Sequence, residues 1–400
     1  MQSCLTRWNS ETFGEIGRNK KILRARILGI QKALRTKHSR FLVTLERDLI
    51  HQYDIILYQE HLLWQMKSRM LWLTYGDANT KFFQLQTKIC RARQHIVTLK
   101  DDTGEWLQGT QLHSYVTNHF QNLFQTVNPH NTLPPPTETF QAMGFNLNFF
   151  QNTLTAFPSS EEIRTTLWSI HPQKALGPDG LHAQFFQHSW GTLSRDITKF
   201  IQTIFITGHV PHDLTAIKLI LIPKVSNPKT VHQLRPISLC NTLYKLLSKI
   251  IVLRLKKFLP DLIHPAQSGF IPGRRATDNY IIAQELIHLI HNKRGKKGLM
   301  AAKIDLEKAY GRLEWSFIRF TLQFFNFPQQ IIDLIMACLE TSSISIMWNG
   351  QISKSFNPSR GVLQGDPLSP YLFILCLNHL SLLLDSALHT KSLQPIKVNR

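Results

Sequence analysis

The chain has 400 residues, and 43% of them are hydrophobic, which is enough for two globular units or for one domain with a long extension. Its 46 lysine and arginine residues exceed its 26 acidic residues, so the formal net charge is +20. More than half of this excess falls within residues 1–100. A charge of this sign predicts a polyanionic partner, either nucleic acid or an anionic surface, whereas the alternative is a merely soluble basic surface.

The five cysteines are scattered and include no C-x-x-C pair, so the sequence indicates neither a disulfide framework nor a zinc knuckle. The N-terminal sequence is polar and basic, and the longest apolar run covers only residues 371–377. These features argue against a signal peptide and a spanning helix. We therefore expect an intracellular, reducing setting and no membrane partner.

From Lys20 to about Trp72 the apolar residues recur at helical spacing, which predicts long amphipathic helices that meet along a packing seam. Three consecutive prolines at 134–136 can continue neither a helix nor a ladder, so they indicate a linker. The predicted organisation is a basic helical connector over 1–126, a proline-containing linker over 127–157 and a domain over 158–400.

The predicted domain mixes helices and strands. Ser159 and Glu162 have capping-box spacing and predict a helix that runs to about Ile170, and Asn349-Gly350 predicts a type I′ hairpin. The remaining expected elements are a turn at 177–180, a strand at 216–223, helices at 241–259 and 278–291, and hairpin strands at 343–348 and to about 356. The fold class predicted is therefore α+β.

Residues 299–306 alternate in hydropathy and predict a half-buried strand, with Asp305 pointing away from the apolar face. A carboxylate at the end of a strand, just before a helix that begins near Glu307, suits a divalent-metal site. A residue that only caps the following helix is the alternative.

A second polar segment covers residues 360–370. Gly365 allows close backbone approach to a ligand, Asp366 suits a helix N-cap, and Pro367 suits the first helical position. An apolar helix is predicted to follow, from Leu368 to about Leu388. Spacing alone leaves a well-capped core helix as the alternative.

Taken together, these segments resemble a known family. KIDLEKAYGRLEW and RGVLQGDPLSPYLF resemble motifs A and B of the palm of LINE-type, non-LTR retrotransposon reverse transcriptases. LIPKVSNPKTVHQLRPISLCNTLYK and HPAQSGFIPGRRATDNYIIAQELIH are similar to that family's fingers, and KALGPDGLHAQFF to its pre-finger segment. WQMKSRMLWLTYGDANTKFF resembles the connector of plant elements. The resemblance implies an incomplete right-hand polymerase fold with fingers and a partial palm.

The resemblance also implies site residues. Asp305 matches the first metal-binding carboxylate, which with its partners would hold Mg²⁺ at the primer end and the triphosphate. Tyr310 matches the steric gate that selects deoxynucleotides, with a core aromatic as the alternative. Lys224 and Arg235 match residues that contact the incoming triphosphate, with solvated surface charge as the alternative.

Gln364 and Gly365 match the motif B loop, which lies against nucleotide and template. The connector's basic residues, interleaved with Trp72, Phe82 and Phe83, could track an RNA backbone and stack bases, although aromatic residues at this spacing are usually core. The basic residues are Lys67, Arg69, Lys81, Arg91 and Arg93. The implied partners are an RNA template, a DNA primer and deoxynucleoside triphosphates, and the family implies a nuclear location.

Two departures from the family pattern stand out. Motif C, an aromatic-Ala-Asp-Asp hairpin, does not appear before Arg400, and the only Asp-Asp pair, Asp101-Asp102, lies in the predicted connector. Gly311 stands where the family usually has Asp. We therefore expect a truncated polymerase without activity of its own, with an unpaired strand edge at Asp305 that promotes aggregation.

Other classes of function remain open. A non-catalytic nucleic-acid-binding remnant would keep the basic connector and the fingers without chemistry. A relative of group II intron maturases is a third interpretation, which the connector and the phrase RPISLCNTLYK disfavour.

Overall fold

The computed structural model describes residues 2–8, 10–11, 15–68, 80–127, 140, 145–294 and 298–396. The chain divides into two compact units, Met1–Val97 and Thr98–Arg400. Residues 98–126, which the sequence groups with the connector, therefore belong to the second unit. The predicted linker is described only in part, because its prolines at 134–136 lie outside the described residues, while residues 147–155 within it form a helix.

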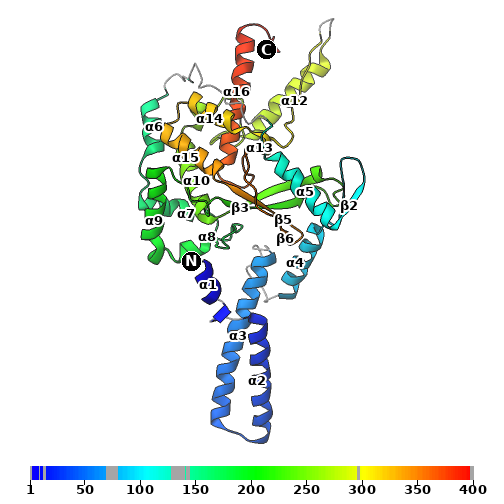
Figure 1. Cartoon of the computed structure of the whole chain (residues 1–400), viewed down its shortest axis with the longest axis vertical. Coiled ribbons are helices and arrows are strands. Elements are labelled where there is room, and N and C mark those ends of the chain that lie inside the picture. The colour runs from blue at the N-terminus through cyan, green and yellow to red at the C-terminus, as the bar shows by residue number, and fades with distance from the viewer. Residues whose placement is uncertain are drawn as a thin grey trace. The chain divides into compact units, whose positions relative to one another are not determined.

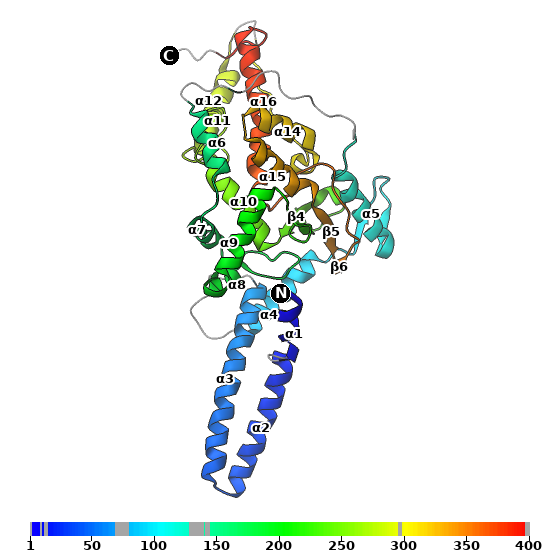
Figure 2. The ribbon, with the colours of Figure 1, turned by 60° about the vertical axis from the view of Figure 1, so that its left-hand side comes forward.

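The first unit is helical, as predicted. Its elements are α1 (Gln2–Trp8), α2 (Ile16–Thr36), α3 (Arg40–Ser68) and α4 (Thr80–Gln94). Figures 1 and 2 show α2 and α3 side by side as an antiparallel hairpin. Leu23 and Leu49 are buried, and Lys20 of α2 pairs with Glu60 of α3. The apolar stripe is therefore a packing seam, as the helical spacing indicates.

The second unit holds the remaining elements. Those that precede the central sheet are β1 (Thr98–Lys100), β2 (Trp106–Gln108), α5 (Gly109–Leu123), α6 (Leu147–Thr155), α7 (Ser160–Trp168), α8 (Ala183–His188) and α9 (Trp190–Thr207). The sheet and the elements within and after it are β3 (Ala216–Pro223), β4 (Leu234–Cys240), α10 (Thr242–Leu255), α11 (Leu259–Leu262), α12 (Ala276–Asn292), α13 (Ala309–Arg312), α14 (Trp315–Phe324), α15 (Gln329–Glu340), β5 (Ser343–Trp348), β6 (Gln351–Ile352) and α16 (Ser369–His389).

The central sheet has the strand order β4-β3-β5-β6. β3 pairs antiparallel with β4 and parallel with β5, and β5 turns back into β6. Ile217, Leu219 and Leu221 of β3 are buried, so alternate residues of this strand enter the core. The mixed α/β architecture agrees with the predicted class.

Several local predictions are confirmed. β3 has the predicted bounds, and the Ser159 side chain accepts a hydrogen bond from the Glu162 backbone N–H at 3.1 Å, which caps α7. Asn349 and Gly350 have φ angles of 46° and 84°, as a type I′ turn requires. Each of these signals is local, so short-range sequence is sufficient to specify it.

The predicted strand over residues 299–306 is wrong. Residues 298–306 are irregular, and no strand pairing is recorded for them in the part of the chain that the structure describes. Met300, Ile304 and Leu306 are 86%, 69% and 51% exposed. Alternating hydropathy marks one face of a segment, but a strand also needs a partner strand, and the described residues supply none for this segment.

The helix predicted after motif B is confirmed as α16, with a later start. It begins at Ser369, so Pro370 rather than Pro367 occupies its first turn, and Leu368 is the N-cap. By length and composition α16 also passes the test for a membrane span, which the short apolar run had seemed to exclude. Core helices pass the same test, and Tyr371, Leu372 and Leu375 are buried in this unit.

Candidate functional site

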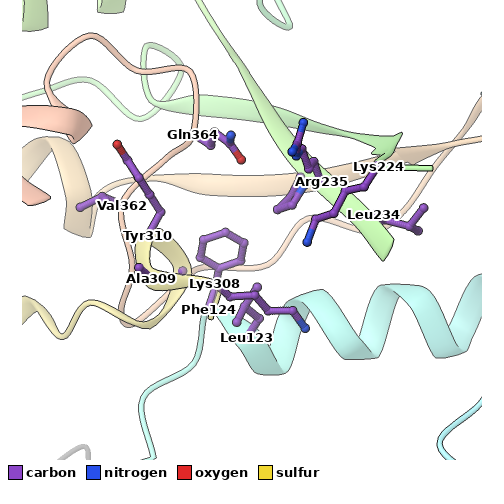
Figure 3. Close-up of a pocket in the computed structure, with 12 residues that line it drawn as sticks. Leu123, Phe124, Lys224, Leu234, Arg235, Lys308, Ala309, Tyr310, Val362 and Gln364 are labelled. Atoms are coloured by element: carbon purple, nitrogen blue, oxygen red, sulfur yellow. The ribbon is translucent and has the colours of Figure 1, made fainter. Parts of the chain in front are cut away.

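Four residues singled out from the sequence line one cavity of about 200 Å³ in the second unit. Lys224 follows β3, Arg235 lies at the start of β4, Tyr310 lies in α13, and Gln364 lies in the loop before α16. In Figure 3, Tyr310 lies at one end, Lys224 and Arg235 lie at the other, and Gln364 lies between them. The fold thus gathers residues that are up to 140 positions apart (364 − 224) around one space.

The pairing of β3 with β4 explains why two of these cations are neighbours. Ile222 pairs with Arg235, and Pro223 pairs with Leu234, so Lys224 and Arg235 both lie at the end of this ladder. The Lys224 backbone N–H donates to the Gln233 carbonyl oxygen at 2.8 Å and continues the pairing past the strand. The hairpin therefore fixes the spacing of the two side chains.

The loop before α16 lies directly against β4. The Ser238 N–H donates to the Gln364 carbonyl oxygen at 2.8 Å. Gly365 has a φ of 130°, and a Cβ atom there would lie 2.6 Å from the Ser238 carbonyl oxygen. Only glycine fits this approach, so the close contact for which the sequence suggested Gly365 is made with the backbone of β4.

Asp366, in the same loop, forms hydrogen bonds to the residues at the start of α16. The buried carboxylate accepts hydrogen bonds from the Leu368 N–H and the Ser369 hydroxyl, each at 3.3 Å. Burial raises its pKa to about 6. Asp366 is not the N-cap of α16 itself, but it ties the first helical residues to the loop that carries Gln364 and Gly365.

Tyr310 is half-buried and stacks on Phe373 of α16, with ring centroids 5.2 Å apart. Its carbonyl oxygen accepts a hydrogen bond from the Val362 N–H at 2.7 Å. Burial raises the pKa of its phenol, so the ring stays neutral at pH 7. The ring is thus fixed in orientation at the cavity wall.

The residues that line the cavity carry a net positive charge. Lys224, Arg235 and Lys308 are among the lining residues, and these residues include no carboxylate. A concave surface with three cations attracts an anionic ligand. Arginine and lysine also supply the donors that phosphate oxygens accept.

Some lining residues were not predicted. Leu123 and Phe124 reach the cavity from the end of α5, which the sequence grouped with the connector. They lie in none of the motifs that the sequence analysis singled out, so no sequence signal marked them. Lys308 lies three residues after Asp305 in the same motif, but the sequence analysis did not single it out, because its position depends on contacts with elements distant in sequence.

Asp305 does not line this cavity. It lies on the irregular segment and is exposed. Among the described residues, no group of three or more His, Cys, Asp or Glu side chains could hold a metal ion. The described residues therefore show no metal site at Asp305, which the resemblance implied only as part of an incomplete one.

The predicted nucleic-acid contacts in the first unit are only partly described. Lys67, Lys81 and Arg93 are exposed on α3 and α4, while Arg69 and the Arg91 side chain lie outside the described residues. Trp72 also lies outside them. Phe83 is 1% exposed and packs against His61, so it is a core residue and not a stacking platform.

The site coincides with a match to a known family. Residues 222–394 match the family model described as "Reverse transcriptase (RNA-dependent DNA polymerase)". Lys224, Arg235, Asp305, Tyr310 and Gln364 all lie within this range. The second unit therefore carries a reverse transcriptase domain.

The chain is also similar to proteins of retrotransposons. The chain is 29% identical over 314 residues to the "Transposon TX1 uncharacterized 149 kDa protein" of Xenopus laevis, covering 78% of this chain and 24% of the relative. It is 30% identical over 233 residues to the Pol polyprotein of the type-2 retrotransposable element R2DM of Drosophila melanogaster, and the match covers 58% of this chain and 21% of the relative. It is 31% identical over 227 residues to the Pol polyprotein of the type-1 retrotransposable element R2 of Popillia japonica, and the match covers 56% of this chain and 30% of the relative.

The chain is therefore similar to proteins of non-LTR retrotransposons, and its residues 222–394 match the reverse transcriptase family. It spans between 21% and 30% of the length of these three relatives.

Proposed function

We propose that the cavity of the second unit binds a deoxynucleoside triphosphate, as the fingers and part of the palm of a right-hand polymerase that copies RNA into DNA. The observation that carries this proposal is the convergence of Lys224, Arg235, Tyr310 and Gln364 on a cationic cavity without carboxylates. These residues come from four segments within the reverse transcriptase match.

Each residue has a distinct task in this proposal. Lys224 and Arg235 bind the phosphates as charge-assisted donors. The Tyr310 ring, fixed by Phe373, occupies the space that a ribose 2′-hydroxyl would need. Gln364, on the loop that Gly365 brings close to β4, contacts the base and template. Nucleotidyl transfer then depends mainly on positioning and electrostatic stabilisation, because phosphoryl transfer needs little covalent chemistry from the protein.

Ultraviolet crosslinking of radiolabelled dTTP to the full chain, followed by peptide mapping, tests this proposal. We expect label in peptides from residues 222–240, 305–313 or 360–366, with an excess of unlabelled dTTP preventing it. Label that maps elsewhere in the chain, or that dTTP does not compete away, would contradict the proposal.

We further propose that the 400-residue chain alone does not extend a primer. Reverse transcriptases use divalent metal ions, whereas Asp305 is exposed and the described residues contain no group of three or more His, Cys, Asp or Glu side chains that could hold one. Primer extension on poly(rA)/oligo(dT) with dTTP and Mg²⁺ measures this directly. Incorporation that Asp305→Ala abolishes would contradict the proposed inactivity.

A second candidate function is binding of nucleic acid without catalysis. The net charge of +20 and the exposed Lys81 and Arg93 on α4 favour it. Gel-shift titration of single-stranded RNA with the Lys81→Glu/Arg93→Glu variant should show weaker binding, whereas Lys37→Glu, at the far end of α2, is a matched control. Equal affinity in all three proteins would exclude α4 as the contact surface.

A further inference from the structure

Lys308 joins three elements at the edge of the cavity. It immediately precedes α13 and has a left-handed backbone conformation with a φ of 51°. Its ammonium nitrogen lies 2.8 Å from His119 Nε2, on α5, and 3.0 Å from His232 Nδ1, in the turn at Val231–Gln233. Two imidazoles therefore hold the end of this lysine side chain in place.

The direction of these hydrogen bonds leaves a donor unused. An ammonium group has three N–H donors and no acceptor, so both imidazole nitrogens must accept. Burial, followed by the charge of Lys308, lowers the pKa of His119 to about 4, so its ring is neutral at pH 7 and can accept. The third N–H of Lys308 has no partner recorded among the described residues, and Lys308 lines the cavity.

The surrounding charges leave Lys308 without a direct counter-ion. Within the described residues it forms no ion pair with a carboxylate, and the nearby carboxylates of Asp102 and Glu307 lie 3.9 and 3.6 Å from the His232 ring nitrogens. The Lys224 ammonium donates to the His232 carbonyl oxygen at 3.1 Å. One residue, His232, thus receives hydrogen bonds from both ammonium groups.

Two lysines held on the same residue repel each other. Burial lowers the pKa of Lys308. Glu307 opposes this shift, Arg312 and Lys224 lower the pKa further, and Asp102 raises it. Such an arrangement of like charges is stabilised when an anion of high charge density enters the space between them. Arg235, on the adjoining strand, adds a third cation to the same cavity.

We propose that Lys308 is a third phosphate-binding residue of the cavity, held by His119 and His232, and that it contacts the polyphosphate chain of the bound nucleoside triphosphate. This inference rests on the proposed function and adds one contact residue and two positioning residues to it. A triphosphate suits the site because it concentrates several negative charges within a length that a cavity of about 200 Å³ can hold. The phosphates of a nucleic-acid strand are spread along its backbone instead.

Calorimetric titration of inorganic tripolyphosphate into the full chain tests the proposal. We expect Lys308→Met to weaken binding at least about tenfold, because it removes a charge-assisted donor. Lys229→Met is the matched control, since Lys229 is exposed near the same turn and does not line the cavity, and we expect it to change affinity less than about twofold. Equal affinity of Lys308→Met and the unchanged chain would overturn the inference.

The histidines have a separate test that is independent of Lys308 itself. His119→Ala should weaken tripolyphosphate binding, and His119→Gln should restore it, because the glutamine amide oxygen can accept where Nε2 does. His232→Asn should likewise keep tripolyphosphate binding, because the asparagine amide oxygen can accept the hydrogen bond in place of Nδ1. If the conservative variants rescue nothing while all variants keep the same circular dichroism spectrum and unfolding midpoint, the positioning role is wrong.

The outcomes separate this inference from the proposed function. Suppose that Lys308→Met weakens tripolyphosphate binding, while dTTP binds no more tightly than tripolyphosphate and its affinity does not depend on Lys224 or Arg235. The phosphate-binding role of Lys308 is then supported, and the proposed nucleotide site is wrong. If dTTP binding depends on Lys224 and Arg235 but not on Lys308, only the inference fails. If Lys308→Met weakens binding of single-stranded RNA and leaves tripolyphosphate binding unchanged, the site holds a strand phosphate and the inference is overturned.

Discussion

The contact between Gly365 and β4 gives a prediction whose size follows from the geometry. In Gly365→Ala, the new Cβ would lie 2.6 Å from the Ser238 carbonyl oxygen, at a φ of 130° that L-residues rarely adopt. The backbone strain alone costs of order 1–3 kcal/mol. Moving the loop to relieve the clash would break the Ser238–Gln364 hydrogen bond, which contributes about 1 kcal/mol. We expect a total loss of about 2–4 kcal/mol in the free energy of unfolding.

Urea unfolding followed by circular dichroism measures this loss against two controls. Gly208 has a φ of 66° with nothing within 4 Å of its Cβ position, so Gly208→Ala isolates the conformational effect and should cost about 1 kcal/mol. Gly191 has open space and lies within α9, so Gly191→Ala should be neutral or stabilising by up to about 1 kcal/mol. A Gly365→Ala variant no less stable than Gly208→Ala would refute the close approach of the loop to β4.

Three other predictions follow from the same structure. The pKa of Asp366 is raised from 3.8 to about 6, so its carboxyl contributes stability that is fully present below pH 3.8 and is lost as the pH rises through about 6. Across that window the free energy of unfolding of the unchanged chain, measured in urea, should fall by about 3 kcal/mol relative to Asp366→Asn. Parallel pH profiles of the two proteins would contradict this. Tyr310→Ala should bring the affinities for ATP and dATP closer together in equilibrium titrations, and an unchanged ratio would exclude Tyr310 as the sugar-selecting residue. Arg254 is 4% exposed and binds both Glu162 oxygens at 2.8 and 2.7 Å, so Arg254→Met should lower the thermal midpoint and cost about 3–5 kcal/mol, whereas a change below about 1 kcal/mol would mean that the pair is dispensable.

The parts of the fold that the sequence predicts correctly depend on short-range chemistry. The bounds of β3 follow from a β-branched run that ends at Pro223, and α7 begins where the Ser159 hydroxyl can accept from the backbone. The hairpin at Asn349-Gly350 needs two positive φ angles, which these two residues adopt readily. In each case the determinant lies within a few residues of the feature.

The errors concern partners that are distant in sequence. Residues 299–306 have the alternation of a strand, but alternation cannot supply the neighbouring strand that a ladder needs. The wall formed by Leu123 and Phe124 likewise depends on how α5 packs near α13. The predicted capping box is half formed, because the Glu162 side chain binds Arg254, which is 92 positions away.

More of the candidate site than of the surrounding fold was predicted from the sequence. Lys224, Arg235, Tyr310 and Gln364 were assigned through resemblance of their motifs, and the structure brings all four to one cavity. Lys308 lay within one of those motifs, yet its orientation depends on His119 and His232, whose positions no local pattern specifies. The sequence therefore predicted residues that line the cavity and missed those that position Lys308.

Calorimetric titration of dTTP into the full chain, beside the Lys224→Met/Arg235→Met variant, tests the central claim most directly. We predict saturable binding of one nucleotide per chain, and a loss of affinity of at least about a hundredfold in the variant, because two charge-assisted donors to phosphate are removed. Equal affinity of the two proteins, with the same unfolding midpoint, would contradict the assignment of this cavity as the nucleotide site.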